Sequence, residues 1–313
     1  MSAVSLHYKA SEFQEAERLA FEVMNWPELP AFAGDQIRDL LNAIWSEQAR
    51  STADVAFLPG QVLVSVKGGE VVTGGAPLDL VVEKVQTIQA MFVRTAEMLL
   101  SRPHRTRGGA PADIRELCRP WLFQAAPGSY QFAVAIQEPA QIDMFGENRP
   151  NAEQISREFM EILRASTADP VNELPKVVSD PEYRRTFLKL SRNLAPRAKS
   201  KVFDEMEVRF PGDQHGVELS GRTRQTIQAA LRVQSPPAGE EATPEVTLEG
   251  TLRAVHLDED WLEITVEGNH RVVWSVQEAY DDVVGPLMNR PVVVRARQSK
   301  SGKLKLIDIE PAE

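Results

Sequence analysis

The segment from Pro77 to Leu100 constrains the fold most, because its apolar residues follow a helical period along its whole length. They recur at alternating three- and four-residue steps, which places them on one face of an α-helix. Pro77 suits a first helical position, and Asp79 lies where the helix dipole favours an anion. A helix of this kind needs another layer to cover its apolar face. The predicted buried face consists of Leu78, Val81, Val85, Ile88, Phe92, Ala96 and Leu99, and the predicted opposite face of Glu83, Lys84, Thr87, Arg94 and Glu97.

Segments with strand-like patterns lie on both sides of this helix. Residues 62–66 alternate between apolar and other side chains, and Gly68-Gly69 predicts a turn to a returning strand over 70–73. After the helix, Pro127-Gly128 predicts a second hairpin. We therefore predict an α+β fold in which an antiparallel sheet has the long helix across one face. The strands of the second hairpin are expected at 121–124 and 130–136, and two earlier helices at 11–24 and 35–48.

A second, smaller α+β block is predicted over 149–233. Asn151 is a suitable N-cap for a helix that runs to about Arg164. Asp180-Pro181 combines a cap with a proline in the first turn, which predicts another helix. The pattern then predicts strands at 202–210 and 216–219 and a helix from Ser220.

The chain changes character after the segment 234–245, which is rich in proline and charge and has no large apolar residue inside it. Such a composition is typical of a linker. Beyond it, strands are expected at 246–257, 261–267, 271–276, 292–297 and 304–309, with a helical piece at 277–288. Five strands with a helix between the third and fourth resemble the order of an OB-fold barrel. A small barrel of the SH3 type is the alternative.

These patterns divide the chain into four parts. We predict an N-terminal α+β domain over 1–148, a middle α+β block over 149–233, a linker over 234–245 and a small OB-like β-barrel over 246–313.

Composition restricts the cellular setting. The formal net charge is −10 and the pI is about 5.2, a balance that works against non-specific binding to nucleic acid or anionic membranes. No apolar run approaches the roughly 20 residues that span a bilayer, and the N-terminus lacks the order of a secretory signal. Cys118 is the only cysteine and is expected to be a small buried residue. We therefore predict a cytoplasmic protein without membrane contact.

A run of basic residues without an intervening acid is the strongest candidate for a charged binding surface. On the predicted helix it occupies the sides that the apolar stripe leaves free, so it is expected to face solvent and to contact phosphates, as in nucleic-acid binding. The alternative is a solvated helix face that offsets acids elsewhere, and the acidic chain favours it. The run consists of Arg184, Arg185, Lys189, Arg192, Arg197, Lys199 and Lys201, and the loop 101–110 adds Arg102, Arg105 and Arg107.

The predicted barrel offers a second candidate surface. Barrels of this type stack bases on aromatic side chains of the second and third strands, and Trp261 and Trp274 lie near those strands. Acidic residues are frequent in the same region, for example over 258–260, and their charge repels phosphate. We therefore expect these tryptophans to serve protein binding or packing rather than nucleic-acid binding.

Catalytic and metal-binding patterns are weak. The five histidines are scattered without a ligand spacing, and no glycine pair is followed by the GK[ST] of a phosphate loop. Asp204-Glu205 with Glu207 on a strand is reminiscent of metal-dependent nucleases, but Arg209 occupies the position where that pattern has a lysine. We predict no catalytic residues, no metal and no cofactor.

Three hypotheses about function are consistent with these patterns. The first is a non-catalytic adaptor, a protein-interaction subunit of a larger cytoplasmic complex with protein partners. The second is a nucleic-acid-associated accessory subunit, for example of a bacterial defence complex, that binds weakly through residues 184–201. The third is an enzyme whose site is assembled from distant residues.

Overall fold

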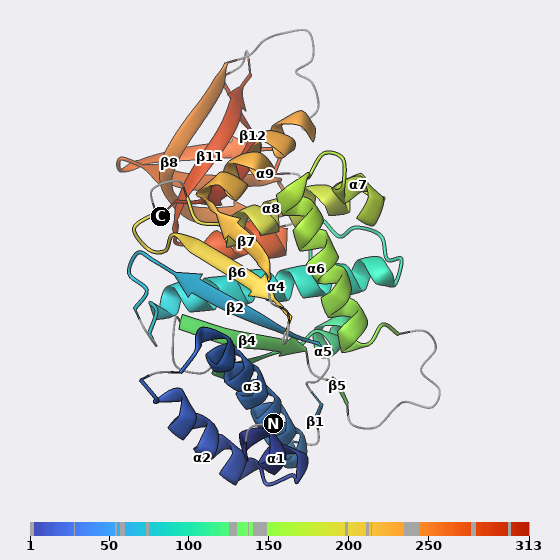
Figure 1. The fold of residues 1–313 in the computed structure, drawn as a ribbon. Coiled ribbons are helices and arrows are strands. Elements are labelled where there is room, and N and C mark those ends of the chain that lie inside the picture. Colours follow the sequence, from blue (N-terminus) through green and yellow to red (C-terminus); the bar gives the residue numbers. More distant parts are fainter. Residues whose placement is uncertain are drawn as a thin grey trace.

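The computed structural model has an α+β fold with two five-stranded sheets, which confirms the α+β part of the predicted fold class (Figure 1). A group of helices lies at one end of the molecule, a ring of strands at the other, and the larger sheet with its helices between them. The structure describes residues 3–27, 29–53, 55–56, 60–72, 75–124, 130–136, 138–139, 149–197, 200–210, 213, 215–234, 244–276, 280–299 and 302–312.

The N-terminal helices form a core of their own. They are α1 (Ala3–Lys9), α2 (Phe13–Met24) and α3 (Ala31–Ala53), of which α1 was not predicted. Val4, Ala20 and Leu41 are among the residues buried between them. An ion pair between Asp39 and Arg209, 3.5 Å apart, connects α3 to the larger sheet.

The larger sheet is antiparallel, as predicted, with the order β3-β4-β2-β6-β7. Its strands are β2 (Gln61–Lys67), β3 (Pro120–Gln124), β4 (Tyr130–Ile136), β6 (Glu205–Arg209) and β7 (Val217–Ser220), and a separate pair joins β1 (Val55–Ala56) to β5 (Glu138–Pro139). The β3–β4 pairing confirms the second hairpin, whose turn at 125–129 lies outside the described residues. The sheet joins strands from both the predicted 1–148 and 149–233 parts, whose boundaries stay a prediction.

The predicted returning strand at 70–73 is wrong. Within the described residues, Val72 forms an isolated bridge with Gly75, and β2 pairs instead with β4 and β6. The chain at Gly69 packs closely against residues that lead into β6, because a Cβ there would lie 2.5 Å from the Val202 carbonyl oxygen. The Glu70 amide donates to the same oxygen at 3.0 Å. The long-range contact with β6 thus replaces the local hairpin.

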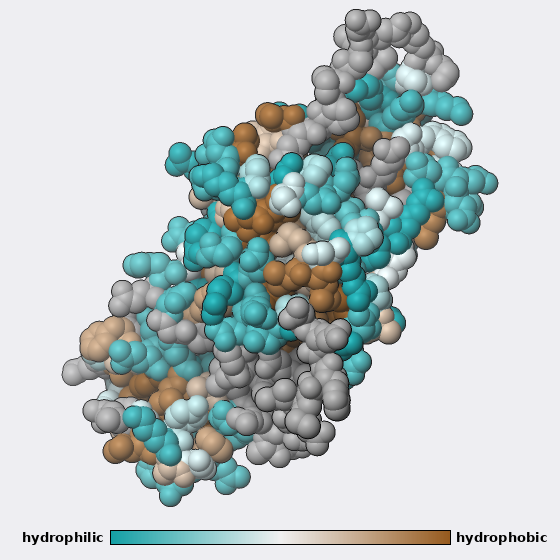
Figure 2. Space-filling view, turned by 90° about the vertical axis from the view of Figure 1, so that its right-hand side faces the viewer, coloured by the Kyte–Doolittle hydropathy of each residue, from teal (hydrophilic) through white to brown (hydrophobic). Residues whose placement is uncertain are grey.

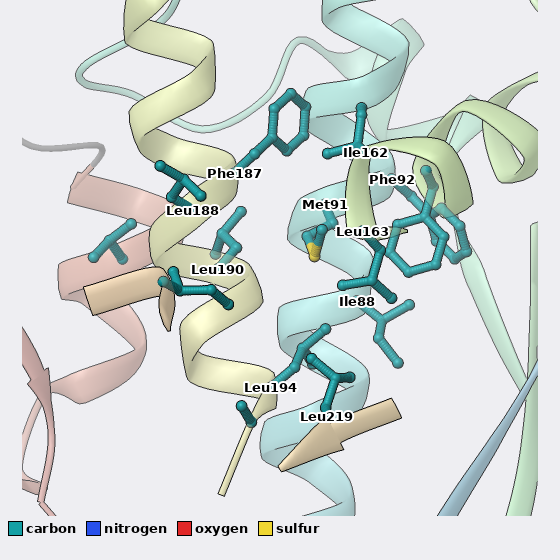
Figure 3. Packing of buried hydrophobic residues seen from close by; sticks show 14 of the residues in the cluster. Ile88, Met91, Phe92, Ile162, Leu163, Phe187, Leu188, Leu190, Leu194 and Leu219 are labelled. Atoms are coloured by element: carbon teal, nitrogen blue, oxygen red, sulfur yellow. The ribbon is translucent and has the colours of Figure 1, made fainter. Parts of the chain in front are cut away.

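Helices of the second half pack with α4 (Leu78–Leu99) around one apolar core. They are α5 (Ala112–Leu117), α6 (Ala152–Ala168), α7 (Leu174–Val177), α8 (Pro181–Leu194) and α9 (Gly221–Gln234). The predicted caps are confirmed, since the Asn151 side chain accepts from the Gln154 amide and that of Asp180 accepts from two amides of α8. In Figure 3, Phe187, Leu190 and Leu194 of α8 lie beside Ile88 and Met91 of α4.

The predicted burial of α4 needs correction on both faces. At the helix ends, Leu78 is 76% and Leu99 is 38% exposed, although both were assigned to the buried face. Lys84, Arg94 and Glu97 were assigned to the opposite face, and all three are buried. The helix lies inside the molecule with neighbours on several sides, and its charged side chains are buried against partners that are distant in the sequence. Periodicity identifies the more apolar face, but it does not show what covers the other.

The C-terminal part is a closed ring of five strands, β8 (Glu245–His256), β9 (Trp261–Val266), β10 (Asn269–Trp274), β11 (Pro291–Gln298) and β12 (Leu304–Pro311). The strands follow the order β10-β12-β11-β8-β9 and the ring closes between β9 and β10. The pairing of β10 with β12 is parallel and the other pairings are antiparallel. Short helical turns at η1 (Tyr280–Val284) and η2 (Gly285–Leu287) connect the third strand to the fourth, as predicted.

Candidate functional site

Helix α8 contacts the ring through a buried cluster of charges. Asp308 of β12 accepts a hydrogen bond from Arg192 of α8 at 2.5 Å and one from Arg295 of β11 at 2.9 Å. Lys189 Nζ lies 3.5 Å from the other Asp308 oxygen, and Arg192 also donates to the Ile309 carbonyl at 2.9 Å. Lys189, Arg192 and Asp308 are buried. Two basic residues of the predicted binding surface therefore hold an acid of the ring.

A second acid on the same strand continues this contact. Glu310 accepts a hydrogen bond from Arg224 of α9 at 2.6 Å and one from Gln228 at 3.1 Å. Arg197 lies 3.7 Å from Glu310 and donates to the Pro311 carbonyl oxygen. Residues after α8 and on α9 thus add to the attachment of β12.

Helix α4 contacts the ring from another side. Arg94, which has no exposed surface, donates to Asp282 at 2.7 Å through Nε and lies 3.3 Å from Glu97. Arg105 donates to Glu97 at 3.0 Å and lies 3.5 Å from Asp282 and 3.7 Å from Asp281. Two arginines and three carboxylates therefore form one network between the loop after α4 and the short helix of the ring.

We call these contacts the docking seam. The docking seam attaches the ring, residues 244–312, to the rest of the chain, which we call the body. From the body it includes Arg94, Glu97, Arg105, Lys189, Arg192, Arg197 and Arg224, and from the ring Asp281, Asp282, Arg295, Asp308 and Glu310.

The remaining basic candidates lie nearer the surface. Arg184 donates to the carbonyl oxygens of residues 178 and 179 at 3.0 and 2.6 Å, and Arg185 donates to the Ile307 carbonyl at 3.4 Å. Lys201 is exposed, and Lys199 lies outside the described residues. The expectation that 184–201 forms one solvent-facing surface is therefore wrong for Lys189 and Arg192, because both face the ring.

The arginines of the basic loop 101–110 also form ion pairs with acids of the same chain. Arg102 pairs with Asp113 at 2.5 Å, and Arg107 donates to Asp260, on the turn between β8 and β9, at 3.2 Å. Both arginines remain partly or fully exposed. The loop 101–110 therefore lies beside the ring and forms ion pairs with it through Arg105 and Arg107.

The environment of the ring acids favours their ionised forms. Burial alone would raise the pKa of Asp308, but the charges of Arg192, Lys189 and Arg295 outweigh it and hold this pKa below its ordinary value. For Glu310, burial likewise opposes the charged form and the neighbouring arginines lower the pKa. The docking seam is therefore an interaction between charged groups in a water-poor setting.

A histidine and a tyrosine lie together at the end of the seam. His104 Nε2 is 2.9 Å from Thr186 Oγ1, and the His104 ring meets the Tyr183 ring edge-on at 5.1 Å. Burial, followed by the nearby charge of Arg94, lowers the pKa of His104 to about 4. This histidine is therefore neutral at neutral pH and serves packing beside the ion pairs.

The outer face of β9 and β10 carries the two predicted tryptophans side by side. Trp261 and Trp274 are directly opposite each other in the antiparallel register. The His256 ring stacks on Trp261 with centroids 5.3 Å apart, and Lys303 Nζ lies 4.9 Å from the centroid of Trp274. Val272, two residues from Trp274 on the same strand face, is exposed. We call His256, Trp261, Val272, Trp274 and Lys303 the tryptophan face.

Acidic residues surround the tryptophan face, as the sequence indicated. Glu259 accepts a hydrogen bond from the Trp261 indole at 2.9 Å. Glu263 lies 2.7 Å from His270, while Asp258 is exposed at the neighbouring turn. The tryptophans thus have acidic neighbours and also two lysines, Lys303 and Lys305, of which Lys305 is the register partner of Trp274 on β12.

Groups of metal ligands, membrane-spanning helices and apolar surface patches in the described residues would each point to a function. Among the residues that the structure describes, no three histidines, cysteines or acids gather as metal ligands. The described helices include none with the length and apolar character needed to cross a membrane. On the side shown in Figure 2, hydrophobic residues form several separate patches between hydrophilic ones. Cys118 is buried, as expected.

Three comparisons with known proteins gave no match: no family model, no curated protein and no solved structure is similar to this chain.

Sequence reasoning missed the acid partners in the seam. Asp308 lies on the strand predicted at 304–309, and Glu310 follows just after it, two residues on. Both are on one side of the observed strand β12. A register shift opposite Arg295 and Ala296 puts Leu306 on the other side of β12 from Asp308, so the apolar alternation of this strand did not reveal a buried acid. The sequence also did not show which of the many basic residues would pair with these acids.

Proposed function

We propose that the chain is a non-catalytic adaptor, a protein-interaction subunit of a larger cytoplasmic complex, and that the tryptophan face is its contact surface. The observation that carries this proposal is the adjacent pair Trp261 and Trp274 on the outer face of β9 and β10. Tryptophan is enriched among the residues that contribute most to protein–protein binding, because its large ring buries much surface in one conformation.

The arrangement of the ring supports the same proposal. We infer that the ring is an OB-type barrel, because its first strand pairs with the second and the fourth and its third pairs in parallel with the fifth. Barrels of this type have their binding surface on strands two and three and on the loops 1–2 and 4–5, where known members bind oligonucleotides and oligosaccharides. The tryptophans lie on strands two and three, and Lys303 comes from the connection between strands four and five.

The charges favour a protein rather than a nucleic acid as the ligand of this face. Glu259 and Glu263 lie within or beside it, and acids repel the phosphate backbone that supplies most nucleic-acid affinity. The second candidate, a nucleic-acid-associated accessory subunit, relies on the basic segment, and Lys189 and Arg192 of that segment are buried against Asp308. Arg184, Arg185 and Lys201 are the residues through which that alternative would act.

Replacing both tryptophans tests the proposal. The Trp261→Ala/Trp274→Ala variant is expected to weaken partner binding by about 2–4 kcal/mol, the range of interface residues that dominate binding. Trp26→Ala is the matched control, because Trp26 is 62% exposed and lies far along the chain from the ring. Circular dichroism and thermal unfolding of all three proteins would establish that each one is folded.

The measurement has two steps. Affinity purification of the tagged protein from its native cells, with and without nuclease and at two salt concentrations, would identify the protein that the double variant loses. Titration of that purified protein against the wild type and both variants then gives the affinities. If the double variant binds like the wild type, or if the retained material is lost with nuclease, the adaptor proposal through this face is wrong.

A further inference from the structure

A pocket of about 310 Å³ lies at the junction between the body and the ring. Lys84 of α4, Asn193 of α8 and Arg224 of α9 line it from the body, together with Arg197 and Phe203. Arg290 and the end of β12 line it from the ring. None of its lining residues belongs to the tryptophan face, so the pocket is a separate feature.

Cationic groups outnumber carboxylates on the wall of this pocket. Four cationic side chains, those of Lys84, Arg197, Arg224 and Arg290, line it against two acids. One of the acids, Glu83, is shared between Lys84 at 2.9 Å and Arg290 at 3.1 Å. The first turns of α4 also contribute to the wall, and Pro77 caps this helix without a side-chain hydrogen bond. Helix N-termini and cations both favour an anion.

A buried amide points independently to an occupant. The Asn193 side chain is only 8% exposed, and its Oδ1 accepts no hydrogen bond from any residue that the structure describes. A buried acceptor without a donor is destabilising, so such groups normally have a partner in the protein, in water or in a ligand. Beside it, Lys84 donates to the Asn193 backbone carbonyl at 2.8 Å and lies 4.9 Å from the centroid of the Phe203 ring.

We propose that the junction pocket binds a small oxyanion, a phosphate- or carboxylate-bearing metabolite that also carries an N–H or O–H donor. The anionic group meets the guanidinium groups of Arg197 and Arg290, and the donor meets Asn193 Oδ1. The pocket has the size of small-molecule sites in proteins. Because the wall comes from both the body and the ring, occupancy stabilises the attachment of one to the other.

Titration calorimetry on the full-length protein tests this proposal with pyrophosphate and citrate as separate probes, at constant ionic strength maintained with sodium chloride. Saturable binding of pyrophosphate identifies a phosphate-type ligand, and saturable binding of citrate identifies a carboxylate-type ligand. Arg290→Gln is expected to weaken the affinity for the bound probe by roughly tenfold or more, which is the effect of losing one charge-assisted hydrogen bond. Arg271→Gln, an exposed arginine of the ring outside the pocket, is the control and should bind within about twofold of the wild type.

Thermal unfolding of the same proteins shows that the variants are folded and supplies a second readout. At the same probe concentration, the bound probe should raise the melting temperature of the wild type and of Arg271→Gln more than that of Arg290→Gln. Absence of saturable binding of both probes to the wild type overturns the proposal. Equal weakening by the two arginine substitutions also overturns it, since that result indicates general charge attraction.

Discussion

Asp308→Ala is expected to lower the free energy of unfolding by about 3–5 kcal/mol, because it leaves several buried cations without their counter-ion. Arg192, Lys189 and Arg295 all lie within 3.5 Å of this carboxylate. Removal of one member of a buried ion pair costs far more than removal of a surface acid, since the remaining charge stays out of water. Urea unfolding followed by circular dichroism measures the change.

Asp258→Ala is the matched control, because Asp258 is an exposed acid of the same ring. Its effect should stay within about 0.5 kcal/mol, as is usual for surface positions. A double-mutant cycle with Arg192→Met, Asp308→Leu and the double variant measures the interaction energy between these two residues, apart from their contacts with other groups. In that cycle the double variant should be more stable than either single one. A loss below about 1 kcal/mol for Asp308→Ala would mean that water, and not the cations, stabilises this carboxylate.

The second large loss of stability is expected for substitutions in helix α4, because both faces of this helix are buried. Phe92→Ala should lower the free energy of unfolding by about 3–5 kcal/mol as a cavity-forming change. Arg94→Ala should lower it by a similar amount, because the largely buried acids Asp282 and Glu97 lose one cation and keep Arg105. Phe92 lies 4.8 Å from the Phe159 ring, centroid to centroid, and Arg94 has no exposed surface. The sequence pattern predicted instead that Arg94→Ala would be nearly silent.

Thermal unfolding of Phe92→Ala, Arg94→Ala and Gln86→Ala decides between these expectations. Gln86 is exposed on the same helix, so its replacement should have little effect. Similar losses for the phenylalanine and the arginine support an α4 enclosed on both sides. An Arg94→Ala protein as stable as Gln86→Ala would restore the expectation from the sequence, in which Arg94 faces solvent.

Local patterns predicted the ring well. Its strands and the helical connection between the third and fourth were expected within a few residues of their positions, because alternation and turn residues act over short distances. The caps of α6 and α8 were predicted for the same reason. Trp261 and Trp274 were expected near the second and third strands, and the structure adds that they lie directly opposite each other.

The docking seam was not predictable in this way. Lys189 and Arg192 lie on the polar side of an amphipathic helix, where solvent exposure is the usual outcome. Their partner Asp308 is more than a hundred residues away in the chain, and Arg94 is 188 residues from Asp282. Helical period carries no information about contacts at that separation. The sequence showed the many charged residues on these helix faces, but only the tertiary structure shows that Lys189, Arg192 and Arg94 are buried against acids of the ring.

The central claim is that Lys189, Arg192 and Arg197 of the basic run serve mainly to attach the ring to the body. Its most direct test is a full-length protein with a protease recognition sequence inserted within 235–243, the part of the predicted linker 234–245 that lies outside the described residues. After cleavage, size-exclusion chromatography and native mass spectrometry measure whether the two pieces stay together. The docking seam predicts that the cleaved wild type elutes as one complex and that cleaved Asp308→Ala separates. Separation of the cleaved wild type under the same conditions would contradict the claim.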